Sequence, residues 1–249
     1  MNPGGGSGAD LSRIWAIVPL RGLESAKSRL AELLDAEERR DLVEELLKRT
    51  LRATADTEAI ERTLVVSPDP EVLSIALAFG AESIQQPSAG LNAGLRLARE
   101  VATARGATAL LVVPADLPAV SPSSLGAFLG RAFDAARPDR GQPLVVLETD
   151  RHGSGTNVLL VSPPDAIEFA FGAGSRQAHR TMTSSAGGHY QEVTGPLSLD
   201  LDTADDLILA ELTDVAELTD AAESADGTTP APEDSAAPPE PVPEPLDAV

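Results

Sequence analysis

Two aspartates near the end of the chain have a spacing that suggests chemistry. Leucines occupy every second position of Leu197–Leu201, and Asp200 and Asp202 alternate with them. In a β-strand, this alternation points the leucines to one face and the two carboxylates to the other. We therefore expect a strand over 197–201 with two neighbouring carboxylates at its carboxyl end, where open α/β sheets bind ligands.

A third aspartate, Asp116, follows the apolar run Ala109–Val113 and lies in the sequence Pro-Ala-Asp-Leu-Pro. Carboxylates gathered at strand ends repel one another unless a cation lies between them. Their oxygens are the ligands that Mg²⁺ prefers. The pattern predicts that Asp116, Asp200 and Asp202 hold Mg²⁺. The alternative is that Asp200 and Asp202 only precede a helix that Thr203 caps.

A loop with several cations follows the first apolar run, Ile14–Val18. It contains Gly22, Lys27 and Arg29, and the chain has only two lysines in total. The compact ammonium group of a lysine suits a phosphate as a point charge, so Lys27 is a candidate phosphate ligand. An exposed helix face would explain the same residues. The loop lacks the glycine spacing of P-loop enzymes and of dinucleotide-binding oxidoreductases, which argues against both classes.

Two glycine-containing loops in the second half could bind an anion. Residues 151–157 offer backbone amides and the Thr156 hydroxyl, and residues 171–175 contain Gly172 and Ser175 at the start of an amphipathic segment. Amides and hydroxyls at a helix start can bind a carboxylate or a phosphate. A hairpin turn and a capped helix explain the two loops equally well. The chain has no cysteine, and its three histidines lack the spacing of a zinc site.

The segments between these motifs must position them, and apolar runs alternate with helical periodicity along the chain. This alternation predicts a three-layer α/β domain with a mostly parallel sheet. The expected strands are Ile14–Val18, Thr63–Val66, Glu82–Gln86, Ala109–Val113, Leu144–Leu147, Val158–Val161 and Leu197–Leu201. The expected helices are Ala36–Ala55, Pro70–Phe79, Leu91–Arg105 and Ser123–Ala136.

The two ends of the 249-residue chain differ in composition from the middle. Residues 1–10 are glycine-rich and predict a flexible leader, residues 11–213 the folded domain, and residues 214–249 a disordered acidic, proline-rich tail. About half of the net charge of −20 lies in this tail, and the remaining domain is still too acidic for nucleic-acid binding through phosphates. No run is long enough for a membrane span, so we expect a cytoplasmic protein without membrane partners.

Several of these motifs together resemble one family. The cation-rich loop, Gly-Leu-Asn-Ala-Gly-Leu at 90–95, Pro-Ala-Asp-Leu-Pro at 114–118, Gly-Ser-Gly-Thr-Asn at 153–157 and Asp-Leu-Asp-Thr at 200–203 resemble the CofC/FbiD guanylyltransferases of coenzyme F420 biosynthesis. The resemblance covers residues 13–212 in order. Members have a GT-A-like nucleotidyltransferase fold and join GTP to phosphoenolpyruvate or 2-phospho-L-lactate, releasing pyrophosphate.

The resemblance implies roles for individual residues. Asp116, Asp200 and Asp202 would hold Mg²⁺, with Lys27 and Asp116 as the catalytic residues. The acid would be bound by Thr156, Gly172 and Ser175, the phosphates by Lys27 and Arg29, and the nucleoside by Asn92. Phosphoenolpyruvate is the expected acceptor, with 2-phospho-L-lactate and 3-phosphoglycerate as alternatives. A second copy of the chain and a downstream transferase of the F420 pathway are candidate protein partners. Another GT-A nucleotidyltransferase, of the molybdenum-cofactor or sugar-phosphate type, is the alternative enzyme, and a non-catalytic binding protein is the alternative class.

Overall fold

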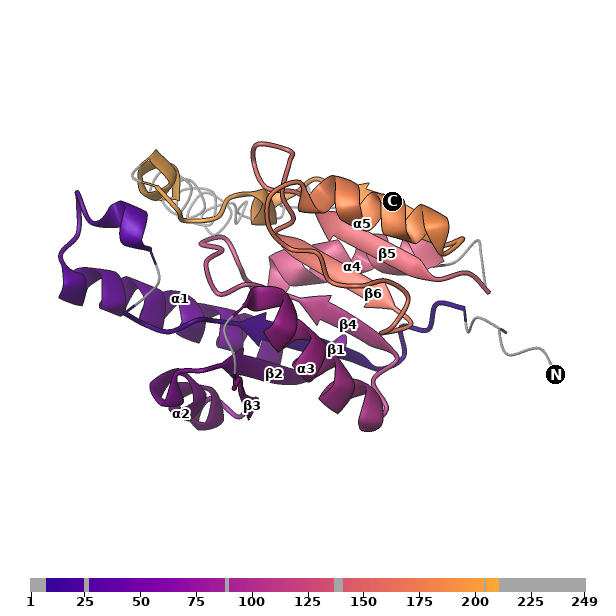
Figure 1. Ribbon diagram of the computed structural model, residues 1–249, viewed down its shortest axis with the longest axis horizontal. Helices are drawn as coiled ribbons and strands as arrows, with labels where there is room; N and C mark the ends of the chain where they lie inside the picture. The colour runs from indigo at the N-terminus through magenta and orange to yellow at the C-terminus, as the bar shows by residue number, and fades with distance from the viewer. Residues whose placement is uncertain (1–7, 25–26, 88–89, 137–140, 204, 211–249) are drawn as a thin grey trace, which may run out of the picture. The chain divides into compact units, whose positions relative to one another are not determined.

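A seven-stranded sheet forms the centre of the structure, and helices lie against both of its faces (Figure 1). The computed structural model describes residues 8–24, 27–87, 90–136, 141–203 and 205–210. The strands are β1 (Ile14–Pro19), β2 (Ile60–Ser67), β3 (Glu82–Gln85), β4 (Ala109–Val112), β5 (Leu144–Glu148), β6 (Val158–Ser162) and β7 (His189–Val193). Their order across the sheet is β3-β2-β1-β4-β6-β5-β7.

The sheet is mostly parallel, as the sequence predicts. Within the described sheet, β6 alone runs opposite to its neighbours, β4 and β5. A short loop joins β5 directly to β6, and such a connection returns the chain in the antiparallel direction. Strands β1, β2 and β4 pair in parallel at the centre, so their carboxyl ends meet at one edge of the sheet.

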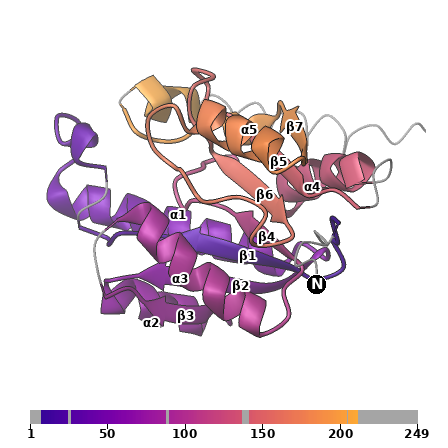
Figure 2. The same cartoon turned by 45° about the vertical axis from the view of Figure 1, so that its right-hand side comes forward.

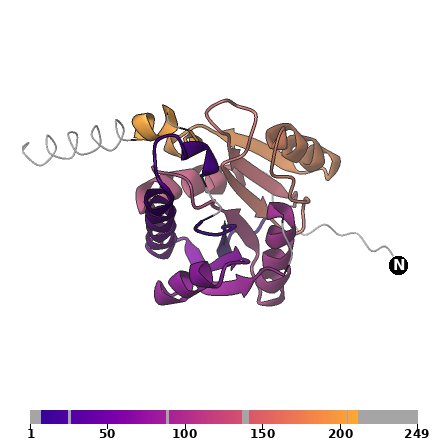
Figure 3. The same ribbon diagram turned by 60° about the vertical axis from the view of Figure 1, so that its left-hand side comes forward.

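The helices form the two outer layers. They are α1 (Ala36–Ala55), α2 (Pro70–Ala78), α3 (Leu91–Ala104), α4 (Pro122–Ala136) and α5 (Ser175–Ser185). Helices α1, α2 and α4 pack on one face, and α3 and α5 pack on the other (Figure 3). The central strands are buried on both faces, which explains why they are apolar runs rather than alternating patterns.

Local sequence signals set the long helix α1. Asp35 and Glu38 form a capping box at its start, in which each side chain accepts a hydrogen bond from the other residue's backbone N–H. Leu47 and Leu51 then lie one turn apart on its buried face. This helix therefore has the bounds that the sequence predicts.

The strand expected over 197–201 is absent from the described sheet. Pro196–Ser198 is a 3₁₀ turn, and the residues after it make no ladder with a strand. Pro196 has no N–H to donate to a neighbouring strand. Leu197 and Leu201 are buried and Leu199 is half-buried for another reason: Leu199 and Leu201 pack in a cluster with Leu46 of α1. The alternation predicted burial correctly but assigned the wrong element.

The seventh strand is β7, which the sequence pattern did not reveal. It pairs in parallel with β5 and lies at the edge of the sheet (Figure 2). Its sequence, His-Tyr-Gln-Glu-Val, is polar because none of its side chains is fully buried. An edge strand of this kind lacks the apolar signal by which the other strands are recognised.

The ends of the domain are defined only in part. The Ala9 N–H donates to the Gln142 carbonyl, and the Asp10 N–H donates to the Ser162 hydroxyl, so these last residues of the expected leader contact the domain. The tail expected at 214–249 lies outside the described residues. No helix in the described ranges is long and apolar enough to span a membrane.

Candidate functional site

A cleft of about 820 Å³ opens at the carboxyl ends of β1, β2 and β4. After β1 the chain continues to β2 on one side, whereas β4 lies on the other side, so the strand order reverses here. Open α/β sheets bind ligands at such a point. The cleft is lined by Pro19, Leu20, Arg21, Lys27, Arg29, Val43, Val66, Pro68, Gln86, Pro87, Gly90, Leu91, Pro114, Ala115, Asp116, Phe171 and Asp202.

The three aspartates singled out from the sequence come together at this cleft. Each of Asp116, Asp200 and Asp202 offers a carboxylate oxygen, and these oxygens lie within 4.8 Å of one another. A backbone hydrogen bond joins the two segments, because the Leu201 N–H donates to the Asp116 carbonyl at 3.0 Å. Three carboxylates this close form an acidic cluster of the kind that binds divalent cations.

Lys27 lies inside this cluster. Its Nζ is 3.0 Å from Asp116 Oδ2 and 2.9 Å from Asp202 Oδ1, and only 6% of its side chain is exposed. Burial opposes its charge, but the two carboxylates outweigh burial and raise the pKa of Lys27. Its backbone φ of 61° is in the left-handed region, which is unusual for a residue with a side chain. Arg29 lies farther out, 3.7 Å from Asp202, with 74% of its side chain exposed.

Asp200 is the carboxylate of this cluster whose charge is least favoured by its surroundings. Burial, together with the neighbouring Asp116 and Asp202, raises the pKa of Asp200. Its described partner is Asn157, whose side-chain amide donates to the Leu197 carbonyl at 3.0 Å and to Asp200 Oδ1 at 3.5 Å. A carboxylate under repulsion from two others gains from a divalent cation, so the donor set fits such an ion.

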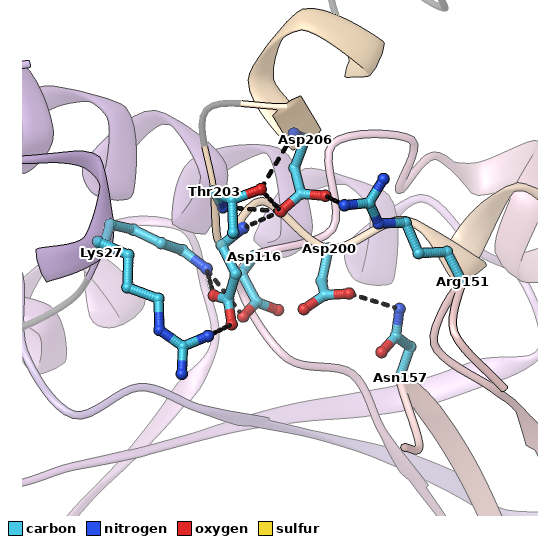
Figure 4. A network of polar contacts seen from close by, with 9 residues as sticks. Lys27, Asp116, Arg151, Asn157, Asp200, Thr203 and Asp206 are labelled. Atoms are coloured by element: carbon cyan, nitrogen blue, oxygen red, sulfur yellow. Dashed lines mark hydrogen bonds and ion pairs between the residues drawn. The ribbon is translucent and has the colours of Figure 1, made fainter. Parts of the chain in front are cut away.

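A second layer of side chains holds the segment that carries Asp202 (Figure 4). Asp206 Oδ2 accepts from the Asp202 N–H, the Thr203 N–H and the Thr203 hydroxyl, and Arg151 forms an ion pair with the other oxygen at 2.8 Å. Although burial opposes it, these donors lower the pKa of Asp206. Residues 205–210 are helical and Thr203 caps them, so the capping interpretation is right for this helix and compatible with the acidic cluster.

The predicted acid-binding residues form a second group, contributed by the 151–157 loop and the start of α5. The Ser175 hydroxyl donates to Thr156 Oγ1 at 3.0 Å, and His179 Nδ1 lies 3.2 Å from the same oxygen. Gly172 precedes them with a φ of 126°, a conformation that favours glycine. Thr156 adjoins Asn157, which contacts Asp200, so the chain links this group directly to the acidic cluster.

Asn92 has a different environment from the one implied for it. Its side-chain amide donates to the Phe171 carbonyl at 3.0 Å, and its side-chain oxygen accepts from the Phe171 N–H at 2.8 Å. These two bonds fasten α3 to the loop that leads to Gly172. A contact between Asn92 and a nucleoside stays a prediction.

The sequence analysis assigned no role in the site to four residues: Asp206, Asn157, Arg151 and Glu148. Asp206 had a recognisable local signal, because it follows Thr203 at the three-residue spacing of a capping box. Asn157, Arg151 and Glu148 act through long-range contacts, and no local pattern announces those contacts. Glu148 is buried at the end of β5, where its carboxyl group lies close to the 195–198 turn.

The family model described as "Guanylyl transferase CofC like" matches residues 14–216. The chain belongs to this family. It is 45% identical over 193 residues to a phosphoenolpyruvate guanylyltransferase of Sphaerobacter thermophilus, an alignment that covers 77% of this chain and 89% of that protein. It is 39% identical to a phosphoenolpyruvate guanylyltransferase of Rubrobacter xylanophilus, with 80% and 93% of the two chains covered. The resemblance that the motifs indicated is confirmed.

Solved structures support the same fold. A nucleotidyl transferase from Methanothermobacter thermautotrophicus superimposes with a TM-score of 0.58 at 16% identity, covering 83% of this chain and 99% of that chain. A cytidylyltransferase from Leptospira borgpetersenii gives a TM-score of 0.54 at 11% identity, with 88% and 98% covered. The expected nucleotidyltransferase fold is therefore confirmed.

Proposed function

We propose that this protein is a phosphoenolpyruvate guanylyltransferase that joins GTP to phosphoenolpyruvate and releases pyrophosphate, as a step in coenzyme F420 biosynthesis. Family membership and the names of the two relatives support the reaction. The main structural support is the meeting of Asp116, Asp200 and Asp202 with Lys27 at the mouth of the cleft. A cytoplasmic location and a single catalytic domain over residues 11–213 belong to the same proposal.

Asp116, Asp200 and Asp202 are the residues that would hold Mg²⁺. When bound, the ion would supply positive charge against the triphosphate and the leaving pyrophosphate. Lys27 lies between two of these carboxylates and lines the cleft, where it would contact a phosphate. Arg29 is exposed beside it and adds a second cation on the same side.

The reaction needs no protein nucleophile. A phosphate oxygen of phosphoenolpyruvate forms a bond to the α-phosphorus of GTP while the bond from that phosphorus to pyrophosphate breaks. The protein contributes by aligning the two substrates and by stabilising the negative charge, here through Lys27 and Arg29. The chain has no cysteine, and the described residues that line the cleft include no serine or histidine.

The acid would bind beside the acidic cluster. Thr156 and Ser175 supply hydroxyl groups, and Gly172 leaves its backbone open to approach. GTP would occupy the cleft between Arg21 and Gly90, with its phosphates towards Lys27. Asn92 holds the loop at Phe171, a residue that lines the cleft, through its two bonds to the Phe171 backbone.

Pyrophosphate release tests the proposal. GTP, ATP and CTP are each combined with phosphoenolpyruvate, 2-phospho-L-lactate and 3-phosphoglycerate, with and without Mg²⁺. We expect the highest kcat/KM for GTP with phosphoenolpyruvate and no release without a divalent ion. Preference for a sugar phosphate, or for a nucleotide other than GTP, would assign the chain to another nucleotidyltransferase reaction.

A further inference from the structure

His179 is a buried histidine for which the reaction above has given no role. It lies on α5 with no exposed surface, and its ring forms a T-shaped pair with the ring of Phe171 at 5.3 Å between centroids. Burial lowers the pKa of His179 to about 4. The imidazole is therefore neutral near pH 7, and one of its two nitrogens carries a hydrogen while the other does not.

The hydrogen bonds decide which nitrogen that is. The Ala170 N–H donates to His179 Nε2 at 3.1 Å, so Nε2 is the acceptor and has no hydrogen. In a neutral imidazole the hydrogen must then be on Nδ1. Nδ1 lies 3.2 Å from Thr156 Oγ1, so the ring donates to Thr156 and does not accept from it.

Thr156 Oγ1 also accepts from the Ser175 hydroxyl at 3.0 Å. A hydroxyl oxygen has two lone pairs, and both are now occupied. The hydrogen of Thr156 must therefore point away from His179 and Ser175, and no acceptor for it occurs among the described residues. If the two hydroxyls exchanged roles, Ser175 would present its hydrogen instead. In either arrangement, one of the two hydroxyl groups keeps a hydrogen that it can donate to a ligand.

We propose that His179 is a positioning residue for the acid, which fixes the Thr156–Ser175 pair so that a hydroxyl hydrogen faces an anionic oxygen of the acceptor. This inference rests on the proposed function, and it adds a residue that touches Thr156 rather than the substrate. A hydroxyl pair without a fixed donor behind it could equally turn a lone pair outward, which would repel a carboxylate or a phosphate. His179 thereby favours an anionic acceptor over a neutral alcohol.

Two amide substitutions separate the two hydrogen bonds of the ring. His179→Asn places an amide N–H near the position of Nδ1 and loses the acceptor for Ala170. His179→Gln keeps an acceptor near the position of Nε2 and loses the donor to Thr156. We expect His179→Gln to raise the KM for phosphoenolpyruvate about tenfold or more, because a hydrogen bond to a charged group is affected, while His179→Asn raises it about threefold at most. The KM for GTP and kcat should change little in either variant.

Controls distinguish this role from a merely structural one. His189→Gln, on the edge strand β7, serves as the matched histidine variant and should leave the KM for the acid unchanged. In a Thr156→Val background, His179→Gln should have no further effect on that KM, since it acts through the missing hydroxyl. Equal KM values for His179→Gln and His179→Asn, or a full additional effect in the Thr156→Val background, would overturn the proposal.

A measurement on the unmodified protein covers the case in which a variant does not fold. The ¹⁵N chemical shifts of the imidazole should show Nδ1 protonated and Nε2 unprotonated from pH 5 to pH 8, and a hydrogen on Nε2 would overturn the proposal. This result does not depend on activity. If the unmodified protein releases no pyrophosphate with any acid, the proposed function fails. Calorimetric titration with phosphoenolpyruvate alone then still compares the affinity of the variants for this acid.

Discussion

The two sides of the acidic cluster are held in place in different ways. Asp116 lies in a turn that begins just after β4, and β4 is paired on both edges by β1 and β6, so the sheet fixes the strand from which this turn starts. Asp200 and Asp202 lie on an irregular segment that has no strand partner. That segment is fixed by buried polar side chains, with Asn157 on Asp200 and Asp206 on the backbone of Asp202.

The difference shows what an irregular segment needs in order to keep a carboxylate side chain in a fixed position. A strand satisfies its backbone groups by its ladder, whereas each N–H of an irregular segment must find its own acceptor. Asp206 supplies that acceptor for Asp202 and Thr203, and Arg151 neutralises Asp206 in turn. We therefore expect the position of the Asp116 carboxylate to depend on few other side chains, and the positions of the Asp200 and Asp202 carboxylates to depend on several.

The largest effect is expected from removing a carboxylate on either side. Asp116→Asn and Asp200→Asn should each lower pyrophosphate release about a hundredfold or more, because both would bind the metal. Burial and two neighbouring carboxylates raise the pKa of Asp200, so the metal-free Asp200→Asn variant should be at least as stable as the unmodified protein at pH 8. Mg²⁺ should raise the thermal midpoint of the unmodified protein only. Full activity of either variant would show that these aspartates bind no essential metal.

Lys27 bridges the two sides, and its loss should be nearly as severe. Lys27→Ala should lower turnover by about a hundredfold, and Lys27→Arg should restore little, because a planar guanidinium does not replace a compact ammonium between two carboxylates. Lys48→Ala is the matched control, since Lys48 pairs with Glu44 on the surface of α1. Full activity of Lys27→Arg would mean that positive charge alone is required there.

A smaller effect is expected from the side chain behind Asp202. Asp206→Asn should lower activity about tenfold and raise the Mg²⁺ concentration needed for half-maximal rate, as for other residues that orient metal ligands. Asp35→Ala removes a comparable helix cap far from the cluster. It should cost about 1 kcal/mol of stability and leave the Mg²⁺ dependence unchanged. An unchanged Mg²⁺ dependence in Asp206→Asn would contradict the idea that the irregular segment needs this support.

Glu148 should affect stability rather than catalysis, through the turn at the start of the irregular segment. Burial raises the pKa of Glu148 from 4.5 to about 7, although backbone N–H groups of Leu197, Gly195 and Ser198 oppose the shift. A carboxyl group with a raised pKa stabilises the fold at low pH, and that stability is lost as the pH rises from about 4.5 through about 7. Glu148→Gln should therefore gain stability relative to the unmodified protein over this window, by up to about 3 kcal/mol. Urea unfolding at several pH values measures the difference.

The pH dependence of stability that His179 causes has the opposite sign, over nearly the same pH range. Its pKa is lowered from 6.5 to about 4, so its contribution is present above pH 6.5 and is lost as the pH falls. The two groups oppose each other in the unmodified protein, and the Glu148→Gln variant should expose the loss of stability in acid that His179 causes. A difference between this variant and the unmodified protein that does not change with pH would contradict the raised pKa of Glu148.

The smallest effect is expected from removing the C-terminal tail. Residues 214–249 contain ten acidic residues, seven prolines and no Lys or Arg, a composition that opposes helix and core formation. A chain ending at Thr213 should keep its thermal midpoint and kcat. Its KM for GTP could fall at low salt through lost charge repulsion, an effect that about 0.15 M salt should screen. A lower midpoint or kcat would show that the Asp200–Asp202 side needs support from beyond residue 213.

Local sequence patterns are enough to predict most of the regular fold. Helix α1 has a capping box and an apolar stripe, and the central strands are uninterrupted apolar runs, so local patterns were sufficient to predict them. The motif around Asp116 was predicted to end a strand for the same reason, and β4 does end just before it. Patterns of this kind work because a helix or a buried strand repeats its environment every few residues.

The assembly of the site depends on tertiary contacts that no local pattern predicts. Leu197–Leu201 has the alternation of a strand, yet its leucines pack on the core and on α1 without a ladder, while the polar β7 completes the sheet. The pairing of Lys27 with Asp116 and Asp202 joins residues 89 and 175 positions apart, and the bonds of Asn92 to Phe171 span 79. A local pattern carries no information about such distant partners, because the chain brings them together only when the core has formed.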